Sequence, residues 1–265
     1  MNRFPLTLLL IGLLLADLVA RADEFTSFDG RKIHYETTGT GRPVLLVHGF
    51  IVNSQMWKDA PLVQQLVANG FQVIIPDLRG NGRSDRPHDT AAYQNDAEIR
   101  DLIGLMKHLK ISQYDVVGYS RGAIIAARQL ALDPAVRRAV LGGMGKGFTD
   151  PNWFRRWNFH AALTGQSDKY PQLKGAIEYA KKSGADTVCL ARMQEFQPVT
   201  SVAELSRTTQ PVLVISGDDD TDNGPASELA ALLPNSVLAS TPGNHNNTAR
   251  SVGFGEKILA FLVKP

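Results

Sequence analysis

Short apolar runs recur along the chain and are separated by segments with helical spacing. The runs cover residues 44–47, 72–75, 114–117, 139–141, 211–215 and 236–239. Because they lack an alternation of apolar and polar positions, they predict strands that are buried on both faces. One helix face, at roughly 3.6 residues per turn, is predicted by the spacing of Ile99, Leu102, Ile103, Met106 and Leu109. Residues 121–132 are also helix-like, and the alternation indicates an α/β fold with a mostly parallel sheet covered on both sides.

Two stretches of the chain depart from this alternation. Residues 24–28 and 32–37 are β-like and flank Asp29-Gly30-Arg31, which predicts a hairpin with a tight turn. Residues 145–205 contain no strand-like run and bring aromatic and basic residues together. These are Trp153, Phe154, Arg155, Arg156, Trp157, Phe159 and His160. We expect residues 145–205 to form a small helical cap inserted into the domain.

The first 22 residues have the pattern of a signal peptide. A basic start at Arg3 precedes an apolar run over residues 4–15, and Ala20-Arg21-Ala22 offers small residues around a cleavage site. We therefore expect residues 1–22 to be removed, leaving a domain of residues 23–265 that is exported to the periplasm or the medium. An uncleaved anchor is the alternative, although the apolar run is short against the ~20 residues of a spanning helix.

Composition narrows the classes of partner. The chain has 28 Lys and Arg against 26 Asp and Glu, so no cationic excess indicates binding to nucleic acid or to an acidic membrane surface. A small neutral or weakly polar substrate fits better. The single cysteine, Cys189, forms no intramolecular disulfide and excludes a cage of several Cys ligands. The sequence predicts no metal and no cofactor, and it leaves the oligomeric state open.

A candidate nucleophile lies in Gly118-Tyr119-Ser120-Arg121-Gly122, a G-x-S-x-G motif between the predicted strand 114–117 and the predicted helix from Arg121. A nucleophile on such a sharp turn needs small neighbours two residues away on either side, because strand and helix leave no room for a Cβ. The strand–turn–helix setting favours a nucleophilic Ser120. An idle serine on a glycine-lined turn is the alternative.

A serine nucleophile needs a base, and the base needs an acid that orients it. Of six histidines, His245 directly follows the last predicted strand, at the edge where sites of parallel sheets form. Asp218, Asp219 and Asp220 follow the strand before it, and we favour Asp220 as the acid. An Asx-rich turn or a divalent-ion site is the alternative for these three aspartates.

Two backbone amides can complete an acyl-transfer site. His48-Gly49-Phe50 follows the first core strand, and its turn can direct the amide of Phe50 toward a carbonyl oxygen. The amide of Arg121, at the start of its helix, supplies the second donor. We expect the His48 side chain to be a structural brace.

Five motifs together resemble the α/β-hydrolase superfamily, in its branch of serine esterases, cofactor-free haloperoxidases and C–C hydrolases. They are PVLLVHGF (43–50), PDLRGNGRSD (76–85), GYSRG (118–122), PVLVISGDDD (211–220) and GNH (243–245). The resemblance spans residues 31–250 and implies the roles given above to Ser120, Asp220, His245, Phe50 and Arg121. Branches that open epoxides or remove halides carry Asp at the position of Ser120, which argues against both activities.

We expect a serine hydrolase that cleaves a carboxylic ester or lactone of a small, largely apolar substrate. A perhydrolase or a C–C hydrolase with the same triad is one alternative, and a ligand-binding protein without turnover is another. The Arg121 side chain either binds a substrate carboxylate or pairs with a structural acid. Trp153 and Trp157, with Phe154 and Phe159, either line the acyl pocket or simply pack a cap helix.

Overall fold

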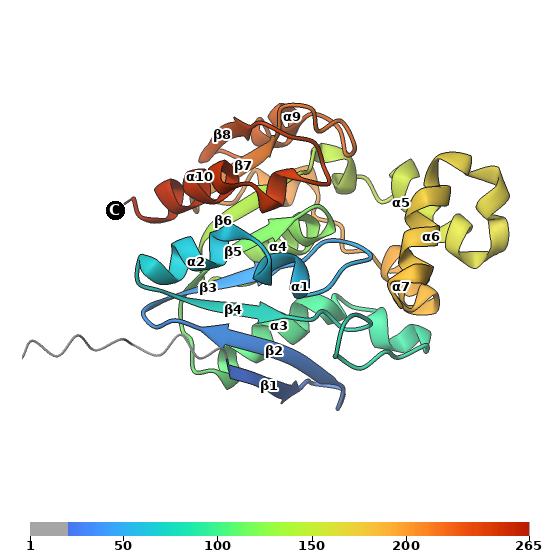
Figure 1. The fold of residues 1–265 in the computed structure, drawn as a ribbon, viewed down its shortest axis with the longest axis horizontal. Coiled ribbons are helices and arrows are strands. Elements are labelled where there is room, and N and C mark those ends of the chain that lie inside the picture. Colours follow the sequence, from blue (N-terminus) through green and yellow to red (C-terminus); the bar gives the residue numbers. More distant parts are fainter. Residues whose placement is uncertain (1–20, 265) are drawn as a thin grey trace, which may run out of the picture.

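The computed structural model describes residues 21–264, which fold around one sheet of eight strands (Figure 1). The strands are β1 (Arg21–Thr26), β2 (Lys32–Thr38), β3 (Arg42–Val47), β4 (Phe71–Pro76), β5 (Tyr114–Tyr119), β6 (Val136–Gly142), β7 (Val212–Gly217) and β8 (Ser236–Thr241). Their order across the sheet is β1-β2-β4-β3-β5-β6-β7-β8, and among them only β2 runs against its neighbours. The predicted α/β fold with a mostly parallel sheet is confirmed.

Helices cover both faces of the sheet. They are α1 (Gln55–Lys58), α2 (Pro61–Ala68), α3 (Ala97–His108), α4 (Arg121–Leu132), α9 (Ala226–Ala230) and α10 (Val252–Leu262). Successive strand residues point to opposite faces. Leu45 and Val47 therefore pack in the core beneath α3, α4 and α9, while Val44 and Leu46 pack beneath α1, α2 and α10. Burial on both faces explains why the strand sequences show no alternation.

The edge strand β8 corrects one sequence expectation. Residues 236–239 do form a strand, but Val237 and Leu238 are 47% and 52% exposed rather than buried. In the sheet of the described residues β8 has β7 as its one neighbour, so part of its surface faces solvent. An apolar run thus predicted a strand correctly and burial incorrectly.

At the opposite edge of the sheet, β1 begins at Arg21, earlier than the predicted strand of residues 24–28. Arg21 and Ala22 already pair with Thr37 and Glu36 of β2, so cleavage after Ala22 would leave residues 23–26 of β1. Residues 1–20 of the expected signal peptide lie outside the described part of the chain. Within residues 21–264, no helix is long and apolar enough to cross a membrane.

The chain between β6 and β7 forms helices that lie beyond one end of the sheet (Figure 1). They are α5 (Phe154–Ala161), α6 (Lys174–Lys182) and α7 (Thr187–Glu195), with short helical turns between them. The following helix α8 (Val202–Leu205) instead packs against α4 and buries Leu205 in the core of the main body. We call α5, α6 and α7, with the turns that join them, the cap. Phe159 and Ile177 form a small apolar core inside it, and Phe50, from the loop after β3, packs against that core. The cap is thereby seated on the loop that follows β3.

Candidate active site

Ser120 occupies a sharp turn between β5 and α4. Its φ of 56° lies in the left-handed region, which costs a non-glycine residue of order 1–3 kcal/mol. The flanking glycines permit this turn: a Cβ on Gly118 would overlap the carbonyl of Gly122, and a Cβ on Gly122 would overlap the carbonyl of Val47. The amide of Ser120 donates to the carbonyl of Gly142 at 2.8 Å. The surrounding backbone therefore fixes the position of the serine.

Ser120, His245 and Asp220 form one hydrogen-bonded row. The loops after β7 and β8 supply Asp220 and His245, and both strands lie on the same side of β5 in the sheet. His245 Nε2 lies 2.9 Å from Ser120 Oγ, and His245 Nδ1 lies 2.9 and 3.1 Å from the two carboxylate oxygens of Asp220. Because an ionised carboxylate only accepts, Nδ1 carries the proton and Nε2 is left to accept from the serine hydroxyl.

Of the three adjacent aspartates, Asp220 is the one that contacts His245. Burial of its carboxyl group raises the pKa, but the hydrogen bond from His245 and the charge of that ring lower the pKa more, so that it lies below its ordinary value. The carboxylate therefore stays ionised beside the imidazole. Asp218 and Asp219 are exposed, and their amides donate to the carbonyls of Thr241 and Gly243 in the turn.

Tyr119 is a contact of His245 that the sequence did not indicate. Its hydroxyl donates to the carbonyl of His245 at 2.8 Å, and the two ring centroids lie 5.2 Å apart. Tyr119 occupies the variable position just before the serine, which carries no signal by itself. Only the sheet order, which brings β8 toward β5 through β6 and β7, puts the two residues together.

The loop after β3 brings a backbone amide beside Ser120. A Cβ built on Gly49 would lie 3.5 Å from the Cβ of Ser120, so this loop lies against the serine. Within residues 21–264, neither the amide of Phe50 nor that of Arg121 donates a hydrogen bond. Both are free to donate to a bound oxygen, as the sequence-based expectation of an oxyanion hole requires.

His48 braces this loop. Its ring is fully buried, Nε2 accepts from the amide of Leu78 at 3.0 Å, and Nδ1 lies 2.8 Å from the carbonyl oxygen of Gly49. Burial lowers the pKa of His48, because the protonated ring would lose its hydration, and the neutral ring is the form that accepts from Leu78. The structure thus ties the Phe50 loop to the loop after β4.

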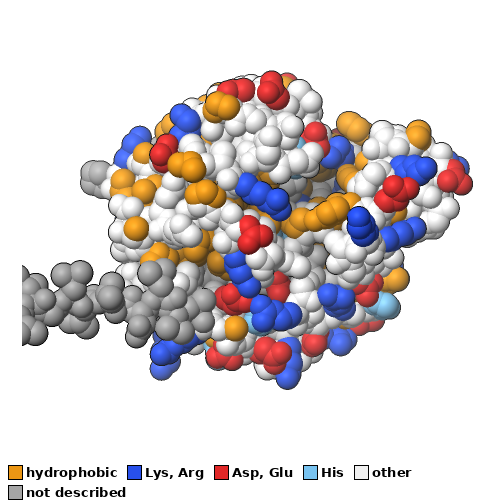
Figure 2. Space-filling model, in the orientation of Figure 1, with side chains coloured by type: hydrophobic (Ala, Val, Ile, Leu, Met, Phe, Trp, Pro, Cys, Tyr) orange, Lys and Arg blue, Asp and Glu red, His pale blue; other side chains and the backbone are white. Residues whose placement is uncertain are grey.

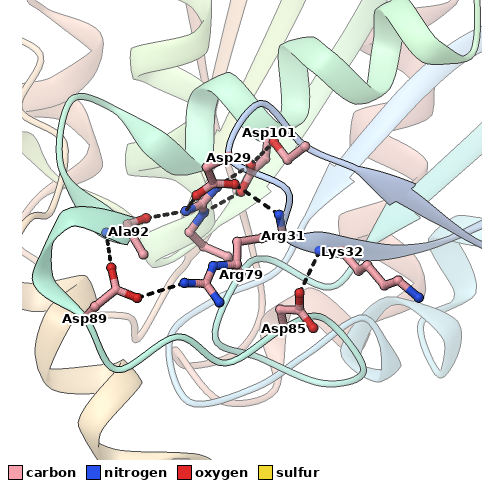
Figure 3. Close-up of polar contacts among 9 residues, drawn as sticks. Asp29, Arg31, Lys32, Arg79, Asp85, Asp89, Ala92 and Asp101 are labelled. Atoms are coloured by element: carbon pink, nitrogen blue, oxygen red, sulfur yellow. Dashed lines mark hydrogen bonds and ion pairs between the residues drawn. The ribbon is translucent and has the colours of Figure 1, made fainter.

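The loop after β4 is anchored by the buried guanidinium of Arg79 (Figure 3). Arg79 donates to both oxygens of Asp101 on α3 at 2.6 Å, to Asp29 in the β1–β2 turn at 2.9 Å, and to the carbonyl of Ala92. Figure 3 also shows the outer pair Arg31–Asp89, at 2.9 Å. Three separate segments therefore converge on one side chain next to Leu78.

The side chain of Arg121 is paired with a structural acid. Its two terminal nitrogens lie 2.8 and 2.6 Å from the two carboxylate oxygens of Glu98 on α3, and both residues are buried. Of the two alternatives for Arg121, the structure therefore favours the structural ion pair over carboxylate binding. Glu98 was not singled out from the sequence, because nothing in the pattern of its helix shows that this acid is buried.

A cavity of about 730 Å³ lies between the cap and the ends of the strands, with Ser120 and His245 in its lining. Its volume is typical of sites for small molecules. Phe159 of the cap and Trp153, just before α5, line it, whereas Phe154 and Trp157 are 71% and 39% exposed and lie outside it. The expected place of Trp157 in the pocket is thus corrected: its indole N–H donates to the carbonyl of Pro151 on the outer side of α5.

Comparison with known proteins places this geometry in a family. The sequence model of the alpha/beta hydrolase family matches residues 44–247, which include the loop after β3, Ser120, Asp220 and His245. The chain belongs to the alpha/beta hydrolase family. The resemblance found in the five motifs is therefore confirmed.

Relatives of this alpha/beta hydrolase have different activities. An epoxide hydrolase of Caballeronia sordidicola is 36% identical over 114 residues, 43% of this chain and 34% of that protein. A 2-hydroxymuconate semialdehyde hydrolase of Pseudomonas sp. (strain CF600) is 36% identical over 115 residues, 43% of this chain and 40% of that protein. The matched part of the chain thus spans about a third to two fifths of these curated relatives.

Solved structures share the fold over nearly the whole chain. An esterase from Exiguobacterium antarcticum superimposes with a TM-score of 0.75 at 21% identity, over 92% of this chain and 98% of that one. At this sequence identity the structural similarity establishes the fold of the hydrolase. Its substrate has to be inferred from the residues of the site.

Cys189 of this hydrolase is not placed to act as a nucleophile. It is buried in the cap, where burial raises the pKa of its thiol to about 11. The side chains of Cys189, His88 and Asp186 lie close together. Within residues 21–264 this is the one cluster of His, Cys, Asp or Glu side chains whose ligand atoms are close enough to bind one metal ion. Asp186 is already engaged there, because it caps α7 by accepting from the amides of Val188 and Cys189.

Proposed function

We propose that this alpha/beta hydrolase cleaves a carboxylic ester, or a lactone, of a small and largely apolar substrate through an acyl intermediate on Ser120. The observation that carries the proposal is the hydrogen-bonded row of Asp220, His245 and Ser120, of which Ser120 and His245 line one cavity together with Phe50 and Arg121, whose amides are free. A serine hydroxyl becomes a useful nucleophile only when such a base takes its proton.

In the proposed reaction, His245 Nε2 accepts the Ser120 proton while Oγ bonds to the carbonyl carbon. The carbonyl oxygen becomes negative and accepts from the amides of Phe50 and Arg121. His245 then donates its proton to the departing alcohol, leaving an acyl-Ser120. Water, deprotonated by His245, breaks that bond and releases the acid. Asp220 stabilises the imidazolium at each step.

Two other reactions fit the same residues. Peroxide in place of water would give a peracid, and cleavage of a C–C bond would replace the alcohol by a carbanion leaving group. Epoxide opening fits less well, because Ser120 stands where epoxide-opening branches carry Asp. A protein that binds an ester without turnover is the remaining alternative from a different class.

The test is the hydrolysis of para-nitrophenyl esters of graded chain length by the wild type, Ser120→Ala and His245→Ala. Ser206→Ala, an exposed serine on the C-terminal side of α8, is the matched control. We expect turnover in the wild type and control and its loss in the two site variants. Measuring peracid against acid in added peroxide separates a perhydrolase from an esterase. A folded wild type that binds these esters but turns none of them over would end the proposal.

We also propose that the protein is exported, on the strength of the basic, apolar and small-residue pattern of residues 1–22. N-terminal sequencing of protein recovered outside the cytoplasm is expected to begin at Asp23. Recovery of the intact chain in the cytoplasm alone would contradict export.

A further inference from the structure

Arginines gather on the wall of the cavity. Four of them line it, namely Arg121, Arg155, Arg156 and Arg250, whereas the one carboxylate among its lining residues is Asp222. Two further carboxylates lie behind the wall, Glu98 behind Arg121 and Asp220 behind His245. Figure 2 shows basic side chains on both sides of the hollow between the main body and the cap. Positive charges therefore outnumber negative ones around the site.

Arg121 and Arg156 have structural partners. Arg121 is held by Glu98. Arg156 is 7% exposed and donates to the carbonyls of Gln194, at 2.6 Å, and Glu195, at the C-terminal end of α7. Arg156 also donates to the carbonyl of Pro151 at 3.5 Å, and none of the ion pairs within residues 21–264 joins a carboxylate to Arg156, so backbone carbonyls balance its charge. Its charge therefore adds to the positive field of the cavity wall.

Arg155, the neighbour of Arg156 in α5, differs in having donors to spare. Its Nη2 lies 3.4 Å from Asp222 Oδ2, and the described residues offer its guanidinium no other hydrogen bond. Charge-assisted N–H···O bonds are normally about 2.7–2.9 Å long, so this contact is loose. The guanidinium rests 5.4 Å from the ring centroid of Phe159, which also lines the cavity. Burial lowers the pKa of Arg155, and the charges of Asp222 and Asp220 only partly oppose that effect.

We infer that the substrate carries a carboxylate and that Arg155 binds it in place of its loose contact with Asp222. A planar guanidinium matches a carboxylate with two parallel hydrogen bonds, and the excess of positive charge on the wall attracts an anion. The inference rests on the proposed ester hydrolysis and names its substrate class: a largely apolar ester with one ionised carboxyl group. Arg155 thereby takes the role that the sequence left open for Arg121.

A competing explanation is that Arg155 only fastens the cap. Asp222 follows Asp220 by two residues and its amide donates to Asp220 Oδ1 at 3.2 Å, so the Arg155–Asp222 contact also links α5 to the loop of the acid. The two explanations predict opposite effects of removing Asp222 on the turnover of a charged ester. For a fastener, removing either partner has the same effect, whereas for a carboxylate site Asp222 competes with the substrate and its removal helps.

The experiment compares matched charged and neutral esters. One pair carries the charge on the acyl side, mono-para-nitrophenyl glutarate against para-nitrophenyl pentanoate. The other carries it on the alcohol side, para-acetoxybenzoate against para-tolyl acetate. The measured quantity is the ratio of kcat/KM, charged over neutral, for the wild type, Arg155→Gln, Arg155→Lys and Asp222→Asn. Arg192→Gln is the control, since Arg192 also lies in the cap and pairs with one acid, Glu195, outside the cavity lining.

In at least one pair we expect the wild-type ratio to exceed one, to fall about tenfold in Arg155→Gln, to recover partly in Arg155→Lys and to rise in Asp222→Asn. The control ratio should equal that of the wild type. A wild-type ratio of one or less in both pairs, or equal losses on charged and neutral esters in both Arg155→Gln and Asp222→Asn, overturns the inference. Failure of the proposed function itself is distinct, because then no ester of either kind is turned over.

Discussion

At the scale of single residues, the site depends on which groups carry protons. Asp220 is ionised and accepts from Nδ1 of His245, which leaves Nε2 as the acceptor for Ser120. A neutral amide at position 220 would present a donor to Nδ1 and favour the opposite tautomer. The proposed function therefore requires the charge of this residue more than its shape.

We predict that Asp220→Asn lowers kcat on the best ester by about 10⁴, as expected when the imidazole is held in the wrong tautomer. Steady-state kinetics on folded protein measures this effect. Asp219→Asn is the matched control, because Asp219 is exposed. If Asp220→Asn costs less than tenfold while Asp219→Asn is inactive, the acid has been assigned to the wrong aspartate.

His48 gives the stability of the protein a pH dependence of known sign. Its pKa in the folded state lies below the ordinary value of 6.5 because the ring is buried. Below pH 6.5, His48 binds a proton in the unfolded chain but stays neutral in the folded chain. The free energy of unfolding therefore falls by up to about 1.4 kcal/mol per pH unit as the pH drops. We predict that His48→Gln, which keeps an acceptor for Leu78, shows a smaller slope in denaturant titrations between about pH 7 and pH 5. Equal slopes in both proteins would contradict this assignment.

At the scale of elements, the amide of Phe50 is positioned through a chain of contacts that starts at Arg79. Arg79 joins α3, the β1–β2 turn and the loop after β4, whose Leu78 donates to His48 beside Phe50. The proposed oxyanion hole is thus supported from residues that lie far away in the sequence.

We predict that Arg79→Met lowers the free energy of unfolding by about 3–5 kcal/mol, because the buried carboxylate of Asp101 loses its cation and keeps the hydrogen bond from the Ser27 hydroxyl. Arg31→Met, which removes the outer pair with Asp89 seen in Figure 3, should cost less than about 1 kcal/mol, since both of those side chains are largely exposed. Guanidinium denaturation measures both values. Similar losses in the two variants would mean that the inner network is not the anchor.

The positions of helices and strands could be predicted from the sequence, whereas the contacts of single side chains between them could not. The helix at residues 121–132 is found with the bounds predicted, and each apolar run lies in or overlaps a strand. For every run except residues 236–239 the reason is burial, which leaves a direct trace in composition. The partners of Arg121 and Trp157 left no such trace. Whether Arg121 meets Glu98, and whether Trp157 faces the cavity or solvent, depends on how α3 and α5 are rotated against their neighbours.

At the scale of the whole molecule, the parallel sheet explains why a site forms from distant residues. The carboxyl ends of β3, β5, β7 and β8 lie at one edge, so the loops that carry Phe50, Ser120, Asp220 and His245 meet there. That these loops meet at the carboxyl ends of the strands could be predicted from the order of the motifs alone. The cap then closes a cavity over it, and the shape and charge of that cavity required the structure.

The proposed ester hydrolysis depends on the activation of Ser120 by His245. The most direct measurement is exposure of the folded protein to a fluorophosphonate probe, with the adduct located by peptide mass spectrometry in the wild type, Ser120→Ala and His245→Ala. We predict one adduct, on Ser120, in the wild type and none in either variant. A folded wild type that stays unlabelled, or one labelled at another residue, would contradict the account.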